Sequence, residues 1–228
     1  MADRKRSGRK PRRRPGLDRR LYDALTENYA RGAIVILGTR DKAGRAVRAG
    51  QRLLTRDDKP SRWSHCFLFG DRRLTCSGPG RPNPRLGLYI LESDLQLAFE
   101  QARLQNGAQE NWLGKWCRPD VEHCAVIDYR LSRREVDIVL ANALHLVDRQ
   151  VSYPLQDLVG TWLAIVRNRL WSANPLKSRN AMYCSAFVRY CYRKAGRDFM
   201  RHNVSLGNTA PEHIARAAEE QGRLRIIR

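Results

Sequence analysis

The sequence predicts an α+β domain in which an antiparallel sheet packs against helices. Short apolar runs that read as strands are mixed with helical patterns, and neither a regular βαβ alternation nor an internal repeat is visible. Two of these runs, at 62–70 and 88–92, are placed so that they could pair antiparallel. With 228 residues, 42 % of them hydrophobic, the chain is long enough to bury one ordinary core.

Four strands are expected, one in each main apolar run. Segment 31–38, RGAIVILG, is continuously apolar between glycines, which is typical of a buried strand. Segment 62–70, RWSHCFLFG, alternates, and the expected face of that strand carries Trp63, His65, Phe67 and Phe69. Segments 88–92 and 123–131 are the third and fourth strands. The Gly- and Pro-rich residues 71–87 predict a loop or a ragged hairpin.

Capping boxes predict where three of the helices begin, and two of these helices lie before residue 150. Ser93 with Gln96 indicates a helix that runs to about Gln105. Ser132 with Glu135 indicates another, and its expected inner face consists of Val136, Val139, Leu140, Ala143, Leu144 and Val147.

Three further helices are expected in the second half of the chain. The first covers 155–171 and ends before a proline, and the second covers 181–196 with Gly196 as its C-cap. The last begins at Thr209, with Glu212 completing a capping box.

The net charge of +20 is concentrated at the N-terminus. Residues 1–20 hold ten Lys or Arg against two Asp and almost no apolar side chains, so we expect a disordered basic arm before a domain covering 21–228. Such an arm associates with nucleic acid or an acidic membrane surface, or serves only as a solubilising tail. No signal-peptide pattern and no apolar run of membrane-spanning length is visible. The expected location is therefore cytoplasmic, with peripheral binding at an anionic membrane as an option.

A second basic feature lies inside the domain. Arg45, Arg48, Arg52 and Arg56 are spaced three and four residues apart, so on a helix they would form one stripe. This stripe is either a solvated face or a ridge that binds anions.

Cys184, in the segment AMYCSAFVRYCYRKAG, is the candidate nucleophile. A cysteine attacks carbonyl carbon as a thiolate, and the start of a helix lowers the thiol pKa through unpaired amides and the helix dipole. If Asn180 caps this helix, Cys184 lies at the end of its first turn, and the Cys184 amide could help to hold an oxyanion. The segment alone also fits a buried structural cysteine, and Cys191 is assigned to the core.

His65 is the candidate base, because it lies in a strand among large apolar residues, where burial and one partner fix its pKa. His145 is expected on a helix face, and His202 and His213 are expected to be exposed. Six cysteines without an export signal indicate free thiols rather than disulfides. A zinc site built from Cys117, His123 and Cys124 is a further alternative, although their spacing matches no zinc motif.

The third member of a triad is open at this level. Glu92 ends the strand that could pair with the His65 strand, and it could orient the imidazole ring. Asp71 and Asp94 are alternatives for this role.

The order of these elements resembles the circularly permuted NlpC-type papain-like enzymes, the YiiX-like amidases related to lecithin retinol acyltransferase. The resemblance is carried by GAIVILG, SRWSHCFLF, the Glu92 strand and YCSAFVRYCYRKAG, and it spans about residues 30–215. Tyr153 and Asp157 resemble a tyrosine-aspartate segment of the family, and NTAPEHIARA resembles its closing helix. Two departures are a longer segment between His65 and Glu92, and Cys66 where an aliphatic residue is more usual.

The resemblance implies a Cys-His-Glu cysteine hydrolase or acyltransferase that needs no metal or cofactor. Cys184, His65 and Glu92 are the expected nucleophile, base and orienting group. Substrates implied by the family are peptidoglycan-type amides or lipid acyl groups, and the basic surface suits an acidic peptide or an anionic headgroup. The rival hypothesis is a protein that binds nucleic acid or an anionic membrane on an inactive papain-like scaffold.

Overall fold

Six strands form a single antiparallel sheet in the order β4-β3-β2-β1-β5-β6. The computed structural model describes residues 16–75, 85–98, 103–149, 183–200 and 204–228. Within them the elements are α1 (Arg19–Glu27), β1 (Ile34–Thr39), α2 (Lys42–Gly50), the 3-10 helix η1 (Arg52–Leu54), β2 (His65–Thr75), β3 (Arg85–Ala98), β4 (Arg103–Trp112), the 3-10 helix η2 (Leu113–Lys115), β5 (Val121–Ile127), α3 (Arg133–Asp148), α5 (Cys184–Lys194), the 3-10 helix η3 (Leu206–Asn208), α6 (Pro211–Glu220) and β6 (Leu224–Ile226). The predicted α+β class is confirmed.

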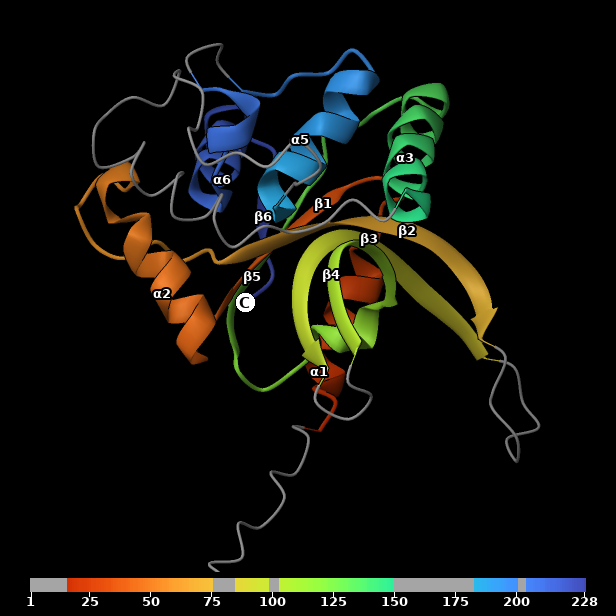
Figure 1. Ribbon diagram of the computed structural model, residues 1–228, viewed down its shortest axis with the longest axis horizontal. Helices are drawn as coiled ribbons and strands as arrows, with labels where there is room; N and C mark the ends of the chain where they lie inside the picture. The colour runs from red at the N-terminus through yellow and green to blue at the C-terminus, as the bar shows by residue number, and fades with distance from the viewer. Residues whose placement is uncertain (1–15, 76–84, 99–102, 150–182, 201–203) are drawn as a thin grey trace, which may run out of the picture.

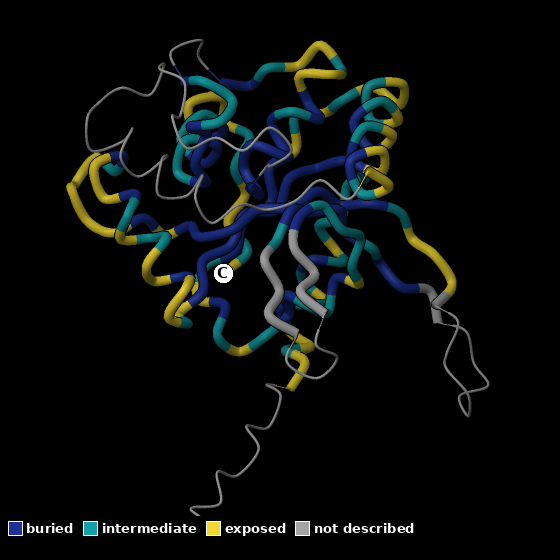
Figure 2. Tube along the Cα trace, viewed as in Figure 1, coloured by how far each residue is buried: buried dark blue, intermediate teal, exposed yellow. Residues whose placement is uncertain are grey.

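Helices α3, α5 and α6 cover one face of the sheet, and α1 packs against the other (Figure 1). The two faces build separate cores, because successive side chains of a strand point to opposite sides. Ile34, Cys66 and Leu68 join the core under α5, whereas Val35 and Phe67 join the core that contains α1. β1 is buried along its length, and β2 is buried from His65 to Gly70 but exposed from Arg72 to Leu74 (Figure 2).

The predicted strands at 31–38, 62–70, 88–92 and 123–131 correspond to β1, β2, β3 and β5. His65, Phe67 and Phe69 share a face as expected, and His65 is the first residue of β2. Trp63 differs from the expectation, because it precedes the strand and packs in the core on the α5 side. The expected ragged hairpin is confirmed in part, because β2 continues to Thr75 and pairs with β3 from Arg85 onward.

The predicted helix from Ser93 to Gln105 is wrong, because its described residues, 93–98 and 103–105, belong to the paired strands β3 and β4. β3 and β4 pair in continuous register from Tyr89↔Trp112 to Ala98↔Arg103, so the backbone groups of Ser93 lie inside a ladder. Strand pairing prevailed over the local capping pattern, because the ladder between β3 and β4 continues over ten residue pairs and supplies a series of backbone hydrogen bonds.

Only the first part of the segment that carries the four arginines is α-helical. Helix α2 ends at Gly50, and η1 and a turn follow it, so the four arginines do not form one helical stripe. The close approach of Gly44 to Thr39 fixes α2 against β1, since a Cβ on Gly44 would lie 1.9 Å from the Thr39 hydroxyl oxygen.

The capping box of α3 is confirmed, with Ser132 and Glu135 bonded to each other's backbone amides. Its inner face differs at one position, since Leu144 is 40 % exposed while Leu146 is buried. The predicted start of the last helix is also shifted: α6 begins at Pro211 with Ala210 as N-cap.

Helix α1 begins at Arg19, so its first two residues lie inside the segment predicted as a disordered arm. The side chain of Asp18 caps this helix by accepting from the Leu21 amide at 3.1 Å. The rest of the arm (1–15), the predicted helix at 155–171, Tyr153 and Asp157 lie outside the described residues. Across the described ranges, no helix combines the length and apolarity needed to cross a bilayer.

Candidate active site

Cys184 is the first residue of α5, which places it closer to the helix N-terminus than expected. Tyr183 is the N-cap and makes no side-chain capping hydrogen bond, so no side-chain cap competes for the amides of the first turn. Asn180, the expected cap, lies outside the described residues. Cys184 is 3 % exposed as a residue and lies at the positive end of an eleven-residue helix, where negative charge is stabilised.

The sheet opens beside the Cys184 thiol. β3 pairs with β2 only as far as Leu68↔Leu91, and from Glu92 onward it pairs with β4 alone. The Phe69 amide donates to the carbonyl of Ala33, the residue before β1. Because amides alternate in direction along a strand, those of Cys66 and Leu68 point toward β3. At Cys66 no β3 partner is present, and this amide donates to the Cys184 sulfur.

His65 and Glu92 meet across this opening. The Nε2 of His65 lies 2.8 Å from Oε2 of Glu92, and both side chains are buried. The imidazole stacks on the indole of Trp116, with ring centroids 4.4 Å apart and planes 29° from parallel. Since Glu92 holds Nε2, the nitrogen left for the thiol of Cys184 is Nδ1. The structure therefore brings together the three residues selected from the sequence.

Glu92 accepts four hydrogen bonds although it is fully buried. Besides His65, the donors are Trp116 Nε1 at 2.7 Å, Asn111 Nδ2 at 2.8 Å and Lys115 Nζ at 2.5 Å. A buried carboxylate stays ionised only with such partners. Lys115 supplies the compensating charge.

The two alternatives for the orienting group are placed elsewhere. Asp71 accepts from Arg31 at 2.6 Å, and Asp94 accepts from Lys115 at 2.9 Å. Of the three carboxylates, Glu92 is the one that hydrogen-bonds to His65.

The pKa values of the three groups move in the directions that favour an ion pair. Burial opposes the change at His65, but the charge of Cys184 and hydrogen bonds with Cys184 and Glu92 outweigh it and raise the pKa of the ring to about 10. Burial also opposes the change at Glu92, where the charge of Lys115 and the bond from His65 bring the pKa to about 2. The pKa of Cys184 is held well below its usual value by the hydrogen bond from Cys66 and, against burial, by the charge of His65.

Neighbouring side chains hold α5 in place. The buried guanidinium of Arg189 forms a bidentate pair with Asp198, at 2.9 Å for both bonds, and also donates to Thr209 Oγ1 at 3.0 Å. Ser185, the residue after Cys184, donates to the carbonyl of Thr209 at 2.7 Å. The helix that carries the thiol is thus tied to the segment that leads into α6.

The residues before His65 are fixed by a second polar cluster. Gln51 donates to the Trp63 carbonyl at 2.8 Å and accepts from the Glu212 amide at 2.8 Å, and Ser61 donates to the Glu212 carboxylate at 2.7 Å. Glu212 was expected to cap α6, but its carboxylate instead accepts from Ser61, which lies on the segment that leads into β2.

Trp116, Lys115 and Cys66 are the site residues that the sequence reasoning missed as functional. The segment at 112–117 carries no strand or helix pattern that fixes the direction of its side chains. Only the return of the chain after β4, through η2, brings Trp116 and Lys115 under Glu92.

The remaining histidines of the described residues make no comparable arrangement. His145 is exposed on α3, as expected, whereas His213 is half-buried and its Nδ1 accepts from the Ala210 amide at 3.0 Å. His123 is half-buried, and burial together with the charge of Arg48 lowers its pKa. His202 lies outside the described part of the chain.

No cluster of three or more His, Cys, Asp or Glu in the described ranges has a geometry that could hold a metal ion. The alternative zinc set is therefore not assembled: the Cys117 thiol instead donates to the Leu113 carbonyl at 3.6 Å. The five described cysteines are free and buried.

The four basic residues at 45–56 have different surroundings. Arg48 binds the Ser61 carbonyl and Glu122, and Arg52 pairs with Asp58. Arg45 and Arg56 are exposed, with no ion pair to any described residue.

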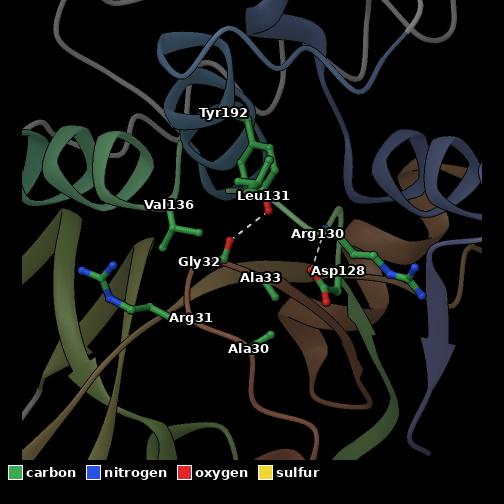
Figure 3. A pocket seen from close by; sticks show the side chains of 9 residues that line it. All are labelled: Ala30, Arg31, Gly32, Ala33, Asp128, Arg130, Leu131, Val136 and Tyr192. Carbon is green, nitrogen blue, oxygen red and sulfur yellow. Dashed lines mark hydrogen bonds between the residues drawn. The ribbon is translucent and has the colours of Figure 1, made fainter. Parts of the chain in front are cut away.

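A cavity of about 250 Å³ lies near the other end of β1, at the C-terminal part of α5. Figure 3 shows Tyr192 donating to the Gly32 carbonyl across it, at 2.9 Å, while the guanidinium groups of Arg31 and Arg130 point away to opposite sides. Cys184, at the opposite end of α5, does not line this cavity.

Comparison with known proteins gives no family assignment. No protein-family model matches the chain, and no curated protein is significantly similar to it in sequence.

Proposed function

We propose that the chain is a cysteine hydrolase or acyltransferase of papain-like design, with Cys184 as nucleophile, His65 as base and Glu92 as the orienting group. The observation that carries the proposal is the buried arrangement of a helix-start thiol, an imidazole and a carboxylate with compensated charge. It fits the chemistry of nucleophilic catalysis, in which a base activates the nucleophile and a third group orients the base.

In the proposed reaction, the Cys184 thiolate attacks the carbonyl carbon of an amide, ester or thioester. The developing oxyanion accepts from the Cys184 backbone amide, which lies at the first position of α5. The His65 imidazolium gives its Nδ1 proton to the leaving amine, alcohol or thiol, and an acyl thioester remains on Cys184.

Release of the acyl group uses the same residues in reverse. His65 takes a proton from water or from another acceptor, whose oxygen or nitrogen attacks the thioester carbonyl, and the Cys184 thiolate leaves. Glu92 stabilises the imidazolium at both stages through Nε2. The identity of the acceptor decides between hydrolysis and acyl transfer.

The papain-like part of the proposal is supported by the order of the elements. A strand with the histidine, a neighbouring strand with the carboxylate and a late helix with the cysteine follow one another as in the permuted family that the sequence resembles. The helix packs against the sheet that carries the other two residues.

The test is formation of an acyl-enzyme with p-nitrophenyl esters as simple acyl donors. We expect a burst of nitrophenol and a mass increase on the Cys184 peptide, lost in Cys184→Ala and His65→Ala. Adding hydroxylamine or an amino acid amide as acceptor separates acyl transfer from hydrolysis. Cys117→Ser is the matched control, because Ser retains a hydroxyl that can donate to the Leu113 carbonyl on the far face of the sheet. Equal labelling of Cys184→Ala and the native chain would contradict the proposal.

A second candidate function is binding to an anionic partner through α2 and η1. Arg45 and Arg56 are exposed there, and Leu53 between them is 57 % exposed. An apolar side chain within a cationic surface suits an acidic membrane, while the arginines alone suit nucleic acid. The N-terminal arm adds charge of the same sign.

The two partners separate in one binding experiment. Leu53→Ser should weaken co-sedimentation with phosphatidylserine vesicles and leave nucleic-acid binding unchanged, whereas the pair Arg45→Gln and Arg56→Gln should weaken both. Binding that survives Cys184→Ala while no acyl-enzyme forms in the native chain would favour a purely binding function.

A further inference from the structure

Cys66 is a second cysteine next to the candidate nucleophile. It follows His65 on β2, where the family that the sequence resembles more usually has an aliphatic residue. Its side chain points to the face covered by α5, because His65 and Phe67 occupy the other face. Cys66 and Cys184 therefore meet in the same core, between β2 and the start of α5.

The contact between the two residues is direct. The thiol and the backbone amide of Cys66 both lie close enough to the Cys184 sulfur to lower the pKa of that thiol. The other described cysteines lie elsewhere: Cys117 and Cys124 belong to the core on the opposite face of the sheet, and Cys191 is two turns further along α5.

We propose that Cys66 and Cys184 form a redox-sensitive pair, in which Cys66 converts an oxidised Cys184 into a reversible intramolecular disulfide. The oxidant is a hydroperoxide, with hydrogen peroxide as the simplest member. The inference rests on the proposed function only in that it requires Cys184 to be a reactive thiolate.

The chemistry balances in two steps. The Cys184 thiolate attacks one peroxide oxygen, the O–O bond breaks, and Cys184 sulfenic acid and hydroxide form while the peroxide gains two electrons. Hydroxide takes the proton of the His65 imidazolium and leaves as water. The Cys66 sulfur then attacks the sulfenic sulfur, the S–O bond breaks, and the Cys66 proton leaves with the hydroxyl group as a second water.

The protonation states of the two sulfurs set the order of these steps. Both residues are buried, and Cys184 is the thiolate of the pair, so Cys184 is the sulfur that reacts with peroxide first. Burial and the neighbouring Cys184 thiolate raise the pKa of Cys66 well above its usual value, so Cys66 stays protonated until the sulfenic acid forms.

Closing the disulfide requires the two sulfurs to approach each other to about 2.05 Å. Cys184 is the first residue of its helix, so no preceding turn obstructs rotation about χ1. The disulfide removes the nucleophile and prevents the sulfenic acid from advancing to sulfinic acid, which thiols do not reduce.

The test treats the full chain with hydrogen peroxide and maps its cysteines by mass spectrometry without reduction. We expect a Cys66–Cys184 cross-linked peptide and the loss of two titratable thiols, both reversed completely by dithiothreitol. In Cys66→Ser treated with a limiting amount of peroxide, we expect a dimedone adduct on Cys184. With excess peroxide we expect Cys184 sulfinic acid, which dithiothreitol does not reverse. Cys117→Ser is the control and should behave like the native chain.

The outcomes separate this proposal from the proposed function. Rapid alkylation of Cys184 by iodoacetamide, combined with irreversible oxidation in the native chain, overturns the redox pair and leaves the nucleophile in place. A Cys184 that reacts with neither reagent overturns both. Cross-linked peptides joining Cys184 to any other cysteine also overturn the pair. The mapping in the native chain decides the matter even if Cys66→Ser fails to fold.

Discussion

The substitution Glu92→Gln tests whether the buried carboxylate controls the Cys184–His65 pair. The carboxylate has donors on both oxygens: Lys115 and Asn111 on Oε1, and Trp116 and His65 on Oε2. A glutamine has one acceptor oxygen and one amide group with two N–H donors. The charged Lys115 takes the oxygen, so the amide group faces His65 and the Trp116 N–H.

The imidazolium then loses its charged acceptor at Nε2, and the neutral imidazole must accept at Nε2 and keep its hydrogen on Nδ1, where it cannot take a proton from Cys184. A hydrogen bond to a charged group contributes about 1.5–3 kcal/mol, and one pH unit in pKa corresponds to about 1.36 kcal/mol. We therefore expect the pKa of His65 to fall from about 10 by about one to two pH units, and the pKa of Cys184 to rise by a similar amount. At a pH below the Cys184 pKa, the thiolate fraction falls about tenfold for each pH unit by which that pKa rises. Alkylation of Cys184 in Glu92→Gln is then about 10- to 100-fold slower than in the native chain.

The assay is the pH dependence of iodoacetamide alkylation at Cys184, followed by peptide mass spectrometry, with thermal unfolding to check the fold. Glu110→Gln is the matched control, since Glu110 is a carboxylate on the same hairpin that pairs with Arg73 and not with His65. If Glu92→Gln remains folded and its alkylation profile coincides with that of the native chain, Glu92 does not act on the imidazole and the reasoning is refuted.

Three further outcomes are expected. NMR of the His65 ring should show an imidazolium throughout the neutral pH range. The pKa of His65 is raised above 6.5, so its proton leaves only as the pH rises through about 10. A titration midpoint near 6.5 would contradict the ion pair. Gly38→Ala should lower the free energy of unfolding by about 1–3 kcal/mol in urea titrations, because its Cβ would lie 1.8 Å from the Arg62 carbonyl oxygen; Gly16→Ala, with open space around it, is the control. Arg189→Met should cost about 3–5 kcal/mol by leaving Asp198 without its bidentate partner, and adding Asp198→Asn should recover part of that loss.

Several parts of the fold follow from local sequence alone. The continuous apolar run of β1 has no other favourable place than a buried strand, and Ser132 with Glu135 satisfies the start of α3 wherever that helix packs. The left-handed backbone at Gly196, with φ of 77°, ends α5 for the same local reason.

Local patterns failed where long-range pairing supplied more hydrogen bonds than a local cap. The residues from Ser93 to Gln105 carry a capping pattern, but β4 pairs with β3 in continuous register and supplies more backbone hydrogen bonds than one cap. Leu144 likewise fits the apolar period of α3, yet it is exposed, and Leu146 packs in the core on the α5 side.

By itself, the sequence selected Cys184 and His65 as candidates, because a cysteine near a helix start and a histidine in an apolar strand are properties of short segments. The choice of Glu92 over Asp71 and Asp94, the charge supplied by Lys115, the stacking of Trp116 and the contact between Cys66 and Cys184 were decided only by the tertiary structure. These contacts join residues on separate elements, and pKa values in a buried site depend on the neighbours that folding brings within a few ångströms.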